Sequence, residues 1–135
     1  MHVNPYLTFK GECETALKFY AKVLGGKTEM MMRFADMPGH APANWNDKVM
    51  HGSIKFGDNV LMGTDAPPER YEPMKGVWVS LQVEKPAEAE RVFKALGEKA
   101  AKVEMPIQET SWAHRFGMLV DQFGTPWMIN CSKYS

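Results

Sequence analysis

Residues 77–97, with the sequence VWVSLQVEKPAEAERVFKALG, contain a strand followed directly by a helix, and this pair decides the fold. The stretch from Val77 to Val83 has valine or leucine at every odd position, and this period of two predicts a half-buried strand. Pro86 suits the first turn of a helix, and Gly97 ends that helix. Between them, apolar residues recur at helical spacing at Ala89, Val92, Phe93 and Leu96.

The chain after this helix predicts three further strands, near residues 101–107, 115–121 and 126–131. A tight turn with the sequence Gln-Phe-Gly-Thr, at residues 122–125, joins the last two. The second half is therefore predicted to be a β-α-β-β-β unit.

The first half predicts the same order of elements, with strands near residues 3–9, 27–34, 49–56 and 59–64. Its helix has apolar residues at positions 16, 17, 20, 23 and 24, and Gly25-Gly26 stops it. Residues 35–47 contain two prolines, a glycine and two asparagines, and are expected to form a loop. Residues 57–59, Gly-Asp-Asn, are a hairpin turn signal.

The two halves also match residue by residue, although chance similarity between short elements is the alternative interpretation. The matching positions are Glu14 with Glu88, Phe19 with Phe93, Leu24-Gly25 with Leu96-Gly97, and Phe56-Gly57 with Phe123-Gly124. We therefore predict an internal repeat. The expected fold class is α+β, with two paired βαβββ modules whose curved mixed sheets form a central trough. Residues 1–135 would be a single domain, with module one at 1–65, a linker at 66–76 and module two at 77–135.

The composition favours a globular protein without nucleic-acid or membrane partners. The chain has 135 residues, of which 44% are apolar, and its 16 basic and 16 acidic residues give no net charge. A balanced charge gives no electrostatic basis for binding nucleic acid or an anionic membrane. The N-terminus lacks a signal-peptide pattern, so a cytoplasmic location is expected. Two cysteines do not make a disulfide framework, and Cys13 is expected at a helix N-terminus as a small structural residue.

The strand pattern predicts which side chains face the trough. The helix of each module covers one face of its sheet, so the other face is available to a ligand. In the strand at 77–83 the odd positions should pack under the helix, which leaves Trp78, Ser80 and Gln82 for the trough. A shift of 74 residues maps Asn4, Tyr6 and Thr8 onto these positions. An ordinary solvent-facing surface would also be polar, and it stays open as the alternative.

Motifs along nearly the whole chain resemble those of a known family. They are Asn4–Phe9, Ala16–Tyr20, Leu24–Gly26, His51–Asp58, Leu61-Met62, Asp65, Met105-Pro106, Thr110–Trp112, Arg115–Gly117 and Asp121–Asn130. Together they are similar to the PhnB-like branch of the glyoxalase/bleomycin-resistance/dioxygenase superfamily, also called vicinal oxygen chelate proteins. The same branch is labelled a "3-demethylubiquinone-9 3-methyltransferase" domain.

The resemblance implies paired βαβββ modules, a homodimer, and metal ligands on the first and last strands of each module. In this sequence the corresponding positions hold Tyr6, Ser80, Leu61 or Met62, and Met128. None of these is a good ligand for a hard or borderline cation. Gln82 could ligate weakly, but one amide does not make a site. We therefore predict no metal and no other cofactor.

Four further residues are candidates for the trough. His51 begins a strand, and His114 and Arg115 begin the matching strand, preceded by Trp112. Histidine offers a base, arginine clamps an acid group, and tryptophan walls a pocket. Ordinary strand-end or core roles are the alternative for all four. The predicted binding residues are thus Tyr6, Thr8, His51, Trp78, Ser80, Gln82, Trp112 and Arg115, with His51 as a weak catalytic candidate.

Three functions remain open from the sequence. The first is a protein that binds a small organic molecule without catalysis. The second is a lyase or oxidoreductase of the glyoxalase/dioxygenase kind, using an atypical metal or a metal-free acid–base step at His51. The third is a dimeric structural domain with a vestigial pocket. A methyltransferase is the least favoured reading, because no strand is followed by a glycine-rich loop with an acidic residue beyond it.

Overall fold

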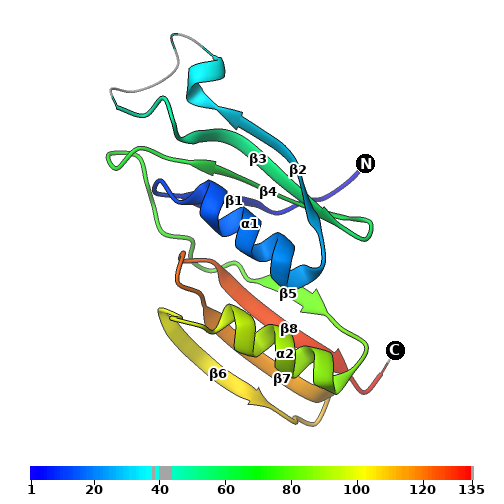
Figure 1. The fold of residues 1–135 in the computed structure, drawn as a ribbon. Coiled ribbons are helices and arrows are strands. Elements are labelled where there is room, and N and C mark those ends of the chain that lie inside the picture. Colours follow the sequence, from blue (N-terminus) through cyan, green and yellow to red (C-terminus); the bar gives the residue numbers. More distant parts are fainter. Residues whose placement is uncertain (38, 40–43, 135) are drawn as a thin grey trace. The chain divides into compact units, whose positions relative to one another are not determined.

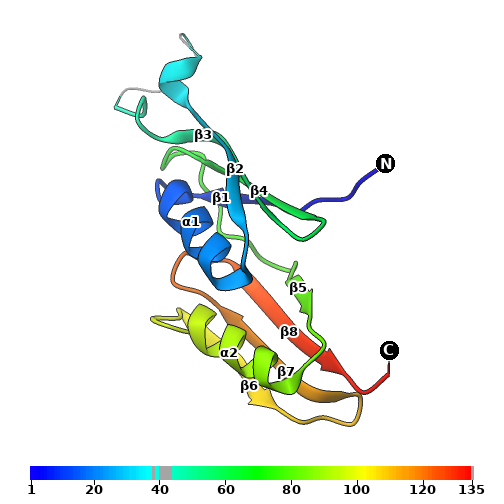
Figure 2. The ribbon, with the colours of Figure 1, turned by 45° about the vertical axis from the view of Figure 1, so that its right-hand side comes forward.

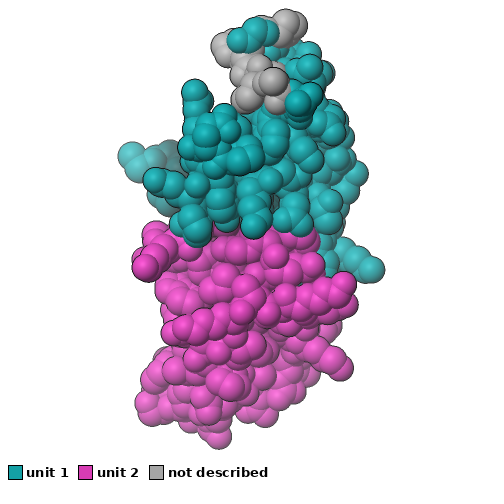
Figure 3. Space-filling model, turned by 90° about the vertical axis from the view of Figure 1, so that its left-hand side faces the viewer, with its two compact units in different colours: residues 1–73 teal, residues 74–135 magenta. Residues whose placement is uncertain are grey.

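The computed structural model describes residues 1–37, 39 and 44–134. These fall into two compact units, Met1–Pro73 and Met74–Ser135, which Figure 3 colours separately. Of the loop predicted at residues 35–47, positions 38 and 40–43 lie outside the described residues.

Unit 1 contains a four-stranded mixed sheet, sheet A, with one helix (Figure 1). The strands occur in the spatial order β1-β4-β3-β2, with β1 parallel to β4 and the other neighbours antiparallel. The elements are β1 (Tyr6–Phe9), α1 (Cys13–Leu24), β2 (Lys27–Arg33), the 3₁₀ turn η1 (Phe34–Asp36), β3 (Val49–Phe56) and β4 (Asn59–Asp65).

Unit 2 repeats this topology in sheet B, with the order β5-β8-β7-β6 and β5 parallel to β8. Its elements are β5 (Val79–Gln82), α2 (Pro86–Leu96), β6 (Lys102–Gln108), β7 (Ala113–Val120) and β8 (Pro126–Ser132). The predicted α+β fold with two βαβββ modules is confirmed. The central trough stays a prediction.

Each helix covers one face of its own sheet, as Figures 1 and 2 show. The predicted helix faces are buried, with Phe93 only partly so; the fully buried members are Ala16, Leu17, Tyr20, Ala89 and Leu96. Glycines in the sheets permit this close approach. A Cβ added to Gly52 would lie 2.8 Å from Leu17 Cδ1, and one added to Gly117 would lie 2.6 Å from Phe93 Cε2. Both contacts are too short for a larger residue.

The first strand of each unit, β1 or β5, is shorter than predicted. Val3 and Val77, expected to pack under the helices, are 93% and 71% exposed. Pro5 precedes β1 and lacks an N–H group for the ladder. β5 pairs with β8 only from Trp127 onward, so residues 77 and 78 have no strand partner there. The sequence pattern continues past the paired residues, so the prediction made both strands longer than the stretch that pairs with a neighbouring strand.

A buried aspartate organises each unit. In unit 1 the Asp65 carboxylate accepts hydrogen bonds from the backbone N–H groups of Gly11, Cys13 and Val49. This ties the start of α1 to β3 and β4.

Cys13 lies buried at the first position of α1, where burial raises the pKa of its thiol and leaves it inert. Both cysteines are free, and no helix in the described part of the chain is long and apolar enough to cross a membrane.

Candidate functional site

The face of each sheet opposite its own helix, here called the open face, is uncharged at its centre, with Lys27 and Lys55 at one end of it on sheet A and Lys102 at one end on sheet B. Strand register assigns its members, because directly paired residues point to the same side of a sheet. On sheet A the central members are Tyr6, Thr8, His51, Ser53, Met62 and Thr64. On sheet B they are Ser80, Gln82, Phe116, Met118, Met128 and Asn130. Hydroxyl, amide, thioether and aromatic groups predominate on both.

On open face A the structure brings together two predicted residues, Tyr6 and His51. The Tyr6 hydroxyl lies 3.0 Å from His51 Nδ1, within hydrogen-bond distance, and the ring centroids are 5.6 Å apart. Burial of the phenol raises the pKa of Tyr6, so the hydroxyl stays protonated at neutral pH and can donate this bond. Thr8 pairs in register with Thr64, whose hydroxyl donates to the Met50 carbonyl at 2.6 Å.

On open face B, Ser80 and Gln82 belong to a chain of hydrogen bonds that also includes Asn130. Gln82 Nε2 donates to Ser80 Oγ at 2.9 Å, and Asn130 Nδ2 donates to Gln82 Oε1 at 2.8 Å. Asn130 Oδ1 is buried and has no partner among the described residues. The same two hydrogen bonds would form in the opposite direction if both amide groups were flipped and the Ser80 hydroxyl were rotated. This group of side chains can therefore present either a donor or an acceptor to a ligand.

Of the two predicted tryptophans, one lies beside this chain and the other does not reach the sheet. Trp112 packs edge-on against Phe116 at a centroid distance of 5.3 Å and is 45% exposed. Phe116 is the register partner of Asn130, so Trp112 borders open face B. Trp78 precedes β5 and lies outside the strand.

The expectation that Arg115 faces the trough is wrong in its orientation. Arg115 pairs in register with Cys131 on the helix side of sheet B, and its Nε lies 2.9 Å from Glu90 Oε1 of α2. Ordinary alternation places Arg115 on the same side as Gly117 and Leu119. A bulge precedes it: Ala113 is opposite Ser132 and Arg115 is opposite Cys131, so His114 is an extra residue.

The bulge places His114 in a cavity of about 680 Å³ at one end of sheet B. The ends of β5 and β8 and the start of β7 meet there, because β7 runs antiparallel to β8 and β8 runs parallel to β5. The cavity is lined by Gln82, Val83, Glu84, His114, Ser132, Lys133 and Tyr134. Gln82 connects this cavity to the hydrogen-bonded chain of open face B.

Sequence reasoning identified only part of this site. It missed Asn130, Glu84, Ser132, Lys133 and Tyr134. The alternation of β8 carries the signal for two of them, since Met128, Asn130 and Ser132 are spaced two apart. The others follow strand ends, where no periodicity indicates a direction.

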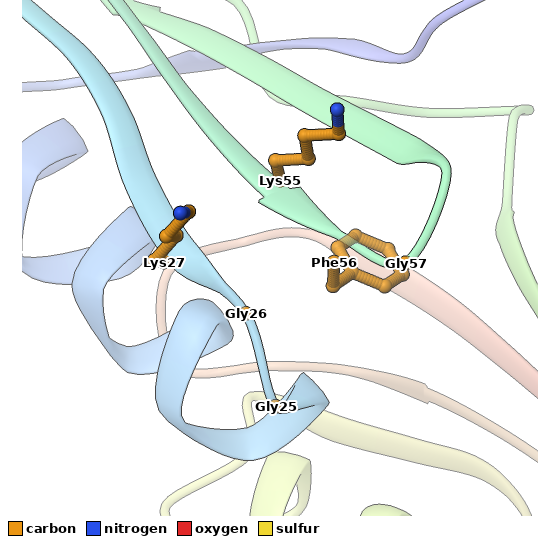
Figure 4. Close-up of a pocket in the computed structure, with 6 residues that line it drawn as sticks. All are labelled: Gly25, Gly26, Lys27, Lys55, Phe56 and Gly57. Atoms are coloured by element: carbon orange, nitrogen blue, oxygen red, sulfur yellow. The ribbon is translucent and has the colours of Figure 1, made fainter.

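A second cavity, of about 350 Å³, is a weaker candidate (Figure 4). Glycines 25, 26 and 57 line it together with Lys27, Phe56 and Lys55. The two lysines are register partners on β2 and β3, and Figure 4 shows both side chains pointing away from the glycine pair. The ammonium groups therefore do not converge on a ligand. Lysine on the edge strand β2 instead discourages pairing with another sheet.

The residues at the superfamily's ligand positions do not fit a metal ion. Register places Tyr6 opposite Met62 and Ser80 opposite Met128, so the mapped first-strand and last-strand positions are true neighbours. A phenol, an alcohol and two thioethers are poor donors for the cations this fold binds. Within residues 1–37, 39 and 44–134, no three histidine, cysteine, aspartate or glutamate side chains gather.

Three further aromatic or basic residues, Arg33, Trp45 and Tyr71, have structural contacts. Arg33 donates to Glu14 at 2.9 Å, and this bond, with a second from Lys18, lowers the pKa of Glu14 to about 2. Trp45 lies under Lys48, and Tyr71 under Lys10.

Two βαβββ units of this topology define the glyoxalase/bleomycin-resistance/dioxygenase fold. A solved domain of that description from Frankia sp. EAN1pec aligns with 98% of each chain at a TM-score of 0.69 and 12% identity, which shows the shared fold. The sequence matches the family described as "3-demethylubiquinone-9 3-methyltransferase" over residues 1–130, and the chain belongs to that family.

Individual relatives agree with this assignment. Protein YjdN of Escherichia coli is 32% identical, over 98% of this chain and 97% of its own. The crystal structure of protein PA1353 from Pseudomonas aeruginosa has a TM-score of 0.90 and 45% identity, over 98% of each chain. A putative 3-demethylubiquinone-9 3-methyltransferase, the PhnB protein of Bacillus cereus, has a TM-score of 0.81 and 20% identity, over 96% of this chain and 98% of its own. The predicted PhnB-like resemblance is confirmed.

Proposed function

We propose that the protein binds a small organic molecule in the cavity at the end of open face B, without a metal ion. The observation that carries this proposal is that Gln82 both lines the 680 Å³ cavity and belongs to the Ser80–Gln82–Asn130 chain. The volume lies within the range of about 300–1,000 Å³ typical of ligand pockets.

The polar groups of the cavity suit recognition of a molecule with several hydrogen-bonding groups. Gln82 can donate and accept. The Ser132 hydroxyl donates to the Tyr134 carbonyl and accepts from the Tyr134 N–H, which leaves it one acceptor position for a ligand. The buried Asn130 Oδ1 is an acceptor without a donor among the described residues. Val83 and the Tyr134 ring add apolar surface for a hydrocarbon portion. The charge-poor open face beside the cavity also favours an organic ligand over a hydrated ion.

A second candidate function is an enzyme of the glyoxalase/dioxygenase kind that uses Tyr6 and His51. The contact between the two side chains favours it, because a protonated phenol beside an imidazole can move a proton to or from a bound substrate. The methyl transfer in the family's description has less support. The sequence has no glycine-rich loop after a strand of the kind that holds a methyl donor.

We also propose that the protein is a cytoplasmic homodimer. Two free, buried thiols suit a reducing compartment, and the resemblance to dimeric relatives motivates the assembly. Sedimentation velocity of the purified chain at several concentrations measures the mass directly. A species of one chain at all concentrations would contradict the dimer.

The binding proposal is tested on the purified, ¹⁵N-labelled full chain. Elemental analysis first measures its content of Ni, Fe, Mn and Zn. A screen of uncharged, anionic and aromatic fragments then follows amide and side-chain signals. We expect no stoichiometric metal, and fragments that shift Gln82, His114 and Asn130 together while Lys27 and Lys55 stay unchanged. A stoichiometric metal, or no fragment that shifts the cavity signals, would overturn the proposal.

A further inference from the structure

The charged groups lining the 680 Å³ cavity are not equally available to a ligand. Lys133 Nζ lies 2.8 Å from Glu109 Oε2, and the bond from Lys133 lowers the pKa of that carboxyl group. The charge of Lys133 is therefore already compensated by a neighbour outside the cavity lining. Glu84 and His114 also line the cavity, and neither side chain forms a hydrogen bond or a salt bridge in the part of the chain that the structure describes, although His114 is close enough to Glu109 to contribute to the lowered pKa of that carboxyl group.

Strand geometry brings these two side chains to the same cavity from different elements. Glu84 lies between the end of β5 and the start of α2. His114 is the bulged residue of β7, and a bulge is a common means of re-aiming one side chain next to a functional site. Between them the cavity offers a carboxylate for a cation and an imidazole N–H for an acid group.

We propose that the ligand is a small zwitterion of the amino-acid type, whose ammonium group contacts Glu84 and whose carboxylate contacts His114. This inference rests on the proposed function and adds the class of ligand to it. A singly charged molecule would leave one of the two groups without a partner. Val83 and the Tyr134 ring receive the hydrocarbon side chain, and Gln82 and Ser132 complete the polar contacts.

Three probes with one carbon skeleton separate the two charges. L-phenylalanine carries both, L-phenylalaninamide only the ammonium group, and 3-phenylpropionate only the carboxylate. NMR titration of the full chain measures each dissociation constant. We expect L-phenylalanine to bind at least about fivefold more tightly than either of the others, since each charge-assisted hydrogen bond contributes roughly that factor.

Two variants assign the charges to residues. Glu84→Gln should remove the preference for L-phenylalanine over 3-phenylpropionate and keep its preference over the amide. His114→Ala should do the reverse. Glu88→Gln, an exposed carboxylate on α2 outside the cavity lining, is the matched control and should change neither ratio. A dispersed spectrum of each variant shows that it is folded.

The outcomes distinguish this inference from the function beneath it. Equal binding of the three probes, or ratios that neither variant changes, would overturn the zwitterion. Uncharged fragments that still shift the cavity signals would then leave the proposed function standing. If neither the probes nor those fragments shift the cavity signals, both proposals fail.

Discussion

Replacing Asp121 should destabilise the unit that carries the cavity more than any surface change. Its carboxylate is fully buried at the turn between β7 and β8. Oδ1 accepts hydrogen bonds from the N–H groups of Phe123 and Thr125 at 2.8 and 2.9 Å, and Oδ2 accepts one from Trp127 Nε1 at 2.8 Å. Asp121→Ala leaves these three donors without their acceptor.

The magnitude follows from the three donors. Each buried donor that loses its partner costs about 1–3 kcal/mol, and water entering the space left by the side chain recovers part of this. We expect Asp121→Ala to lower the free energy of unfolding by about 3–5 kcal/mol, out of a total of about 5–15 kcal/mol for a domain. Asp121→Asn should cost less, about 2 kcal/mol, because Oδ1 keeps its two backbone donors while Nδ2 opposes Trp127 Nε1.

Urea titration followed by amide signals from both units measures these differences. Asp58→Asn, in the exposed turn between β3 and β4, is the control and should change the midpoint little. If Asp121→Ala lowered the free energy of unfolding by less than about 1 kcal/mol, the reasoning would be refuted, since the three buried hydrogen bonds would then contribute less than such bonds usually do.

Three other changes test the packing and charges around the site. Gly117→Ala should cost about 1–3 kcal/mol in thermal or urea unfolding, because the new Cβ would lie 2.6 Å from the Phe93 ring; unaltered stability would show that the helix can move away. Glu14→Gln should reduce, by under about 1 kcal/mol, the fall in the free energy of unfolding that is measured as the pH is lowered, because the site is partly exposed. The hydrogen bond from Arg33 lowers the pKa of Glu14 from 4.5 to about 2, so its stabilising effect is complete above pH 4.5 and lost as pH falls toward 2. Arg115→Ala should leave the affinity for L-phenylalanine within about twofold and cost under about 1 kcal/mol, because the guanidinium pairs with a helix carboxylate; a large loss of affinity would return Arg115 to the site.

The sequence predicted the parts of the fold that repeat with a fixed period. The helix faces around Leu17 and Leu96 are buried as expected, because a stripe at helical spacing has few other ways to leave water. The alternation in β5 likewise placed Ser80 and Gln82 together on the face opposite α2. Local patterns of this kind do not need knowledge of the neighbouring strand.

The errors occur where a neighbouring strand decides the outcome. Val3 and Val77 continue the alternation of their segments, yet both lie beyond the pairing, which nothing in the alternation itself records. The bulge at His114 adds one residue without changing the composition of β7, so the direction of His114 could not be predicted from its place in the segment. Glu84 and Lys133, 49 positions apart in the sequence, share a cavity only because β5 and β8 are parallel neighbours.

The two units carry different side chains on their open faces, which indicates that the two faces have different tasks. The two sheets have the same strand order, so β3 corresponds to β7 and β4 to β8. The residues that support the fold agree between the units: Gly52 and Gly117 both permit the close approach of a helix. The open-face positions do not agree beyond one methionine in each last strand. The differing pairs are Tyr6 with Ser80, Thr8 with Gln82, Thr64 with Asn130, His51 with Phe116, and Ser53 with Met118. The two open faces therefore offer different chemistry: hydrogen-bonded amides and a hydroxyl on sheet B, and a phenol–imidazole contact on sheet A.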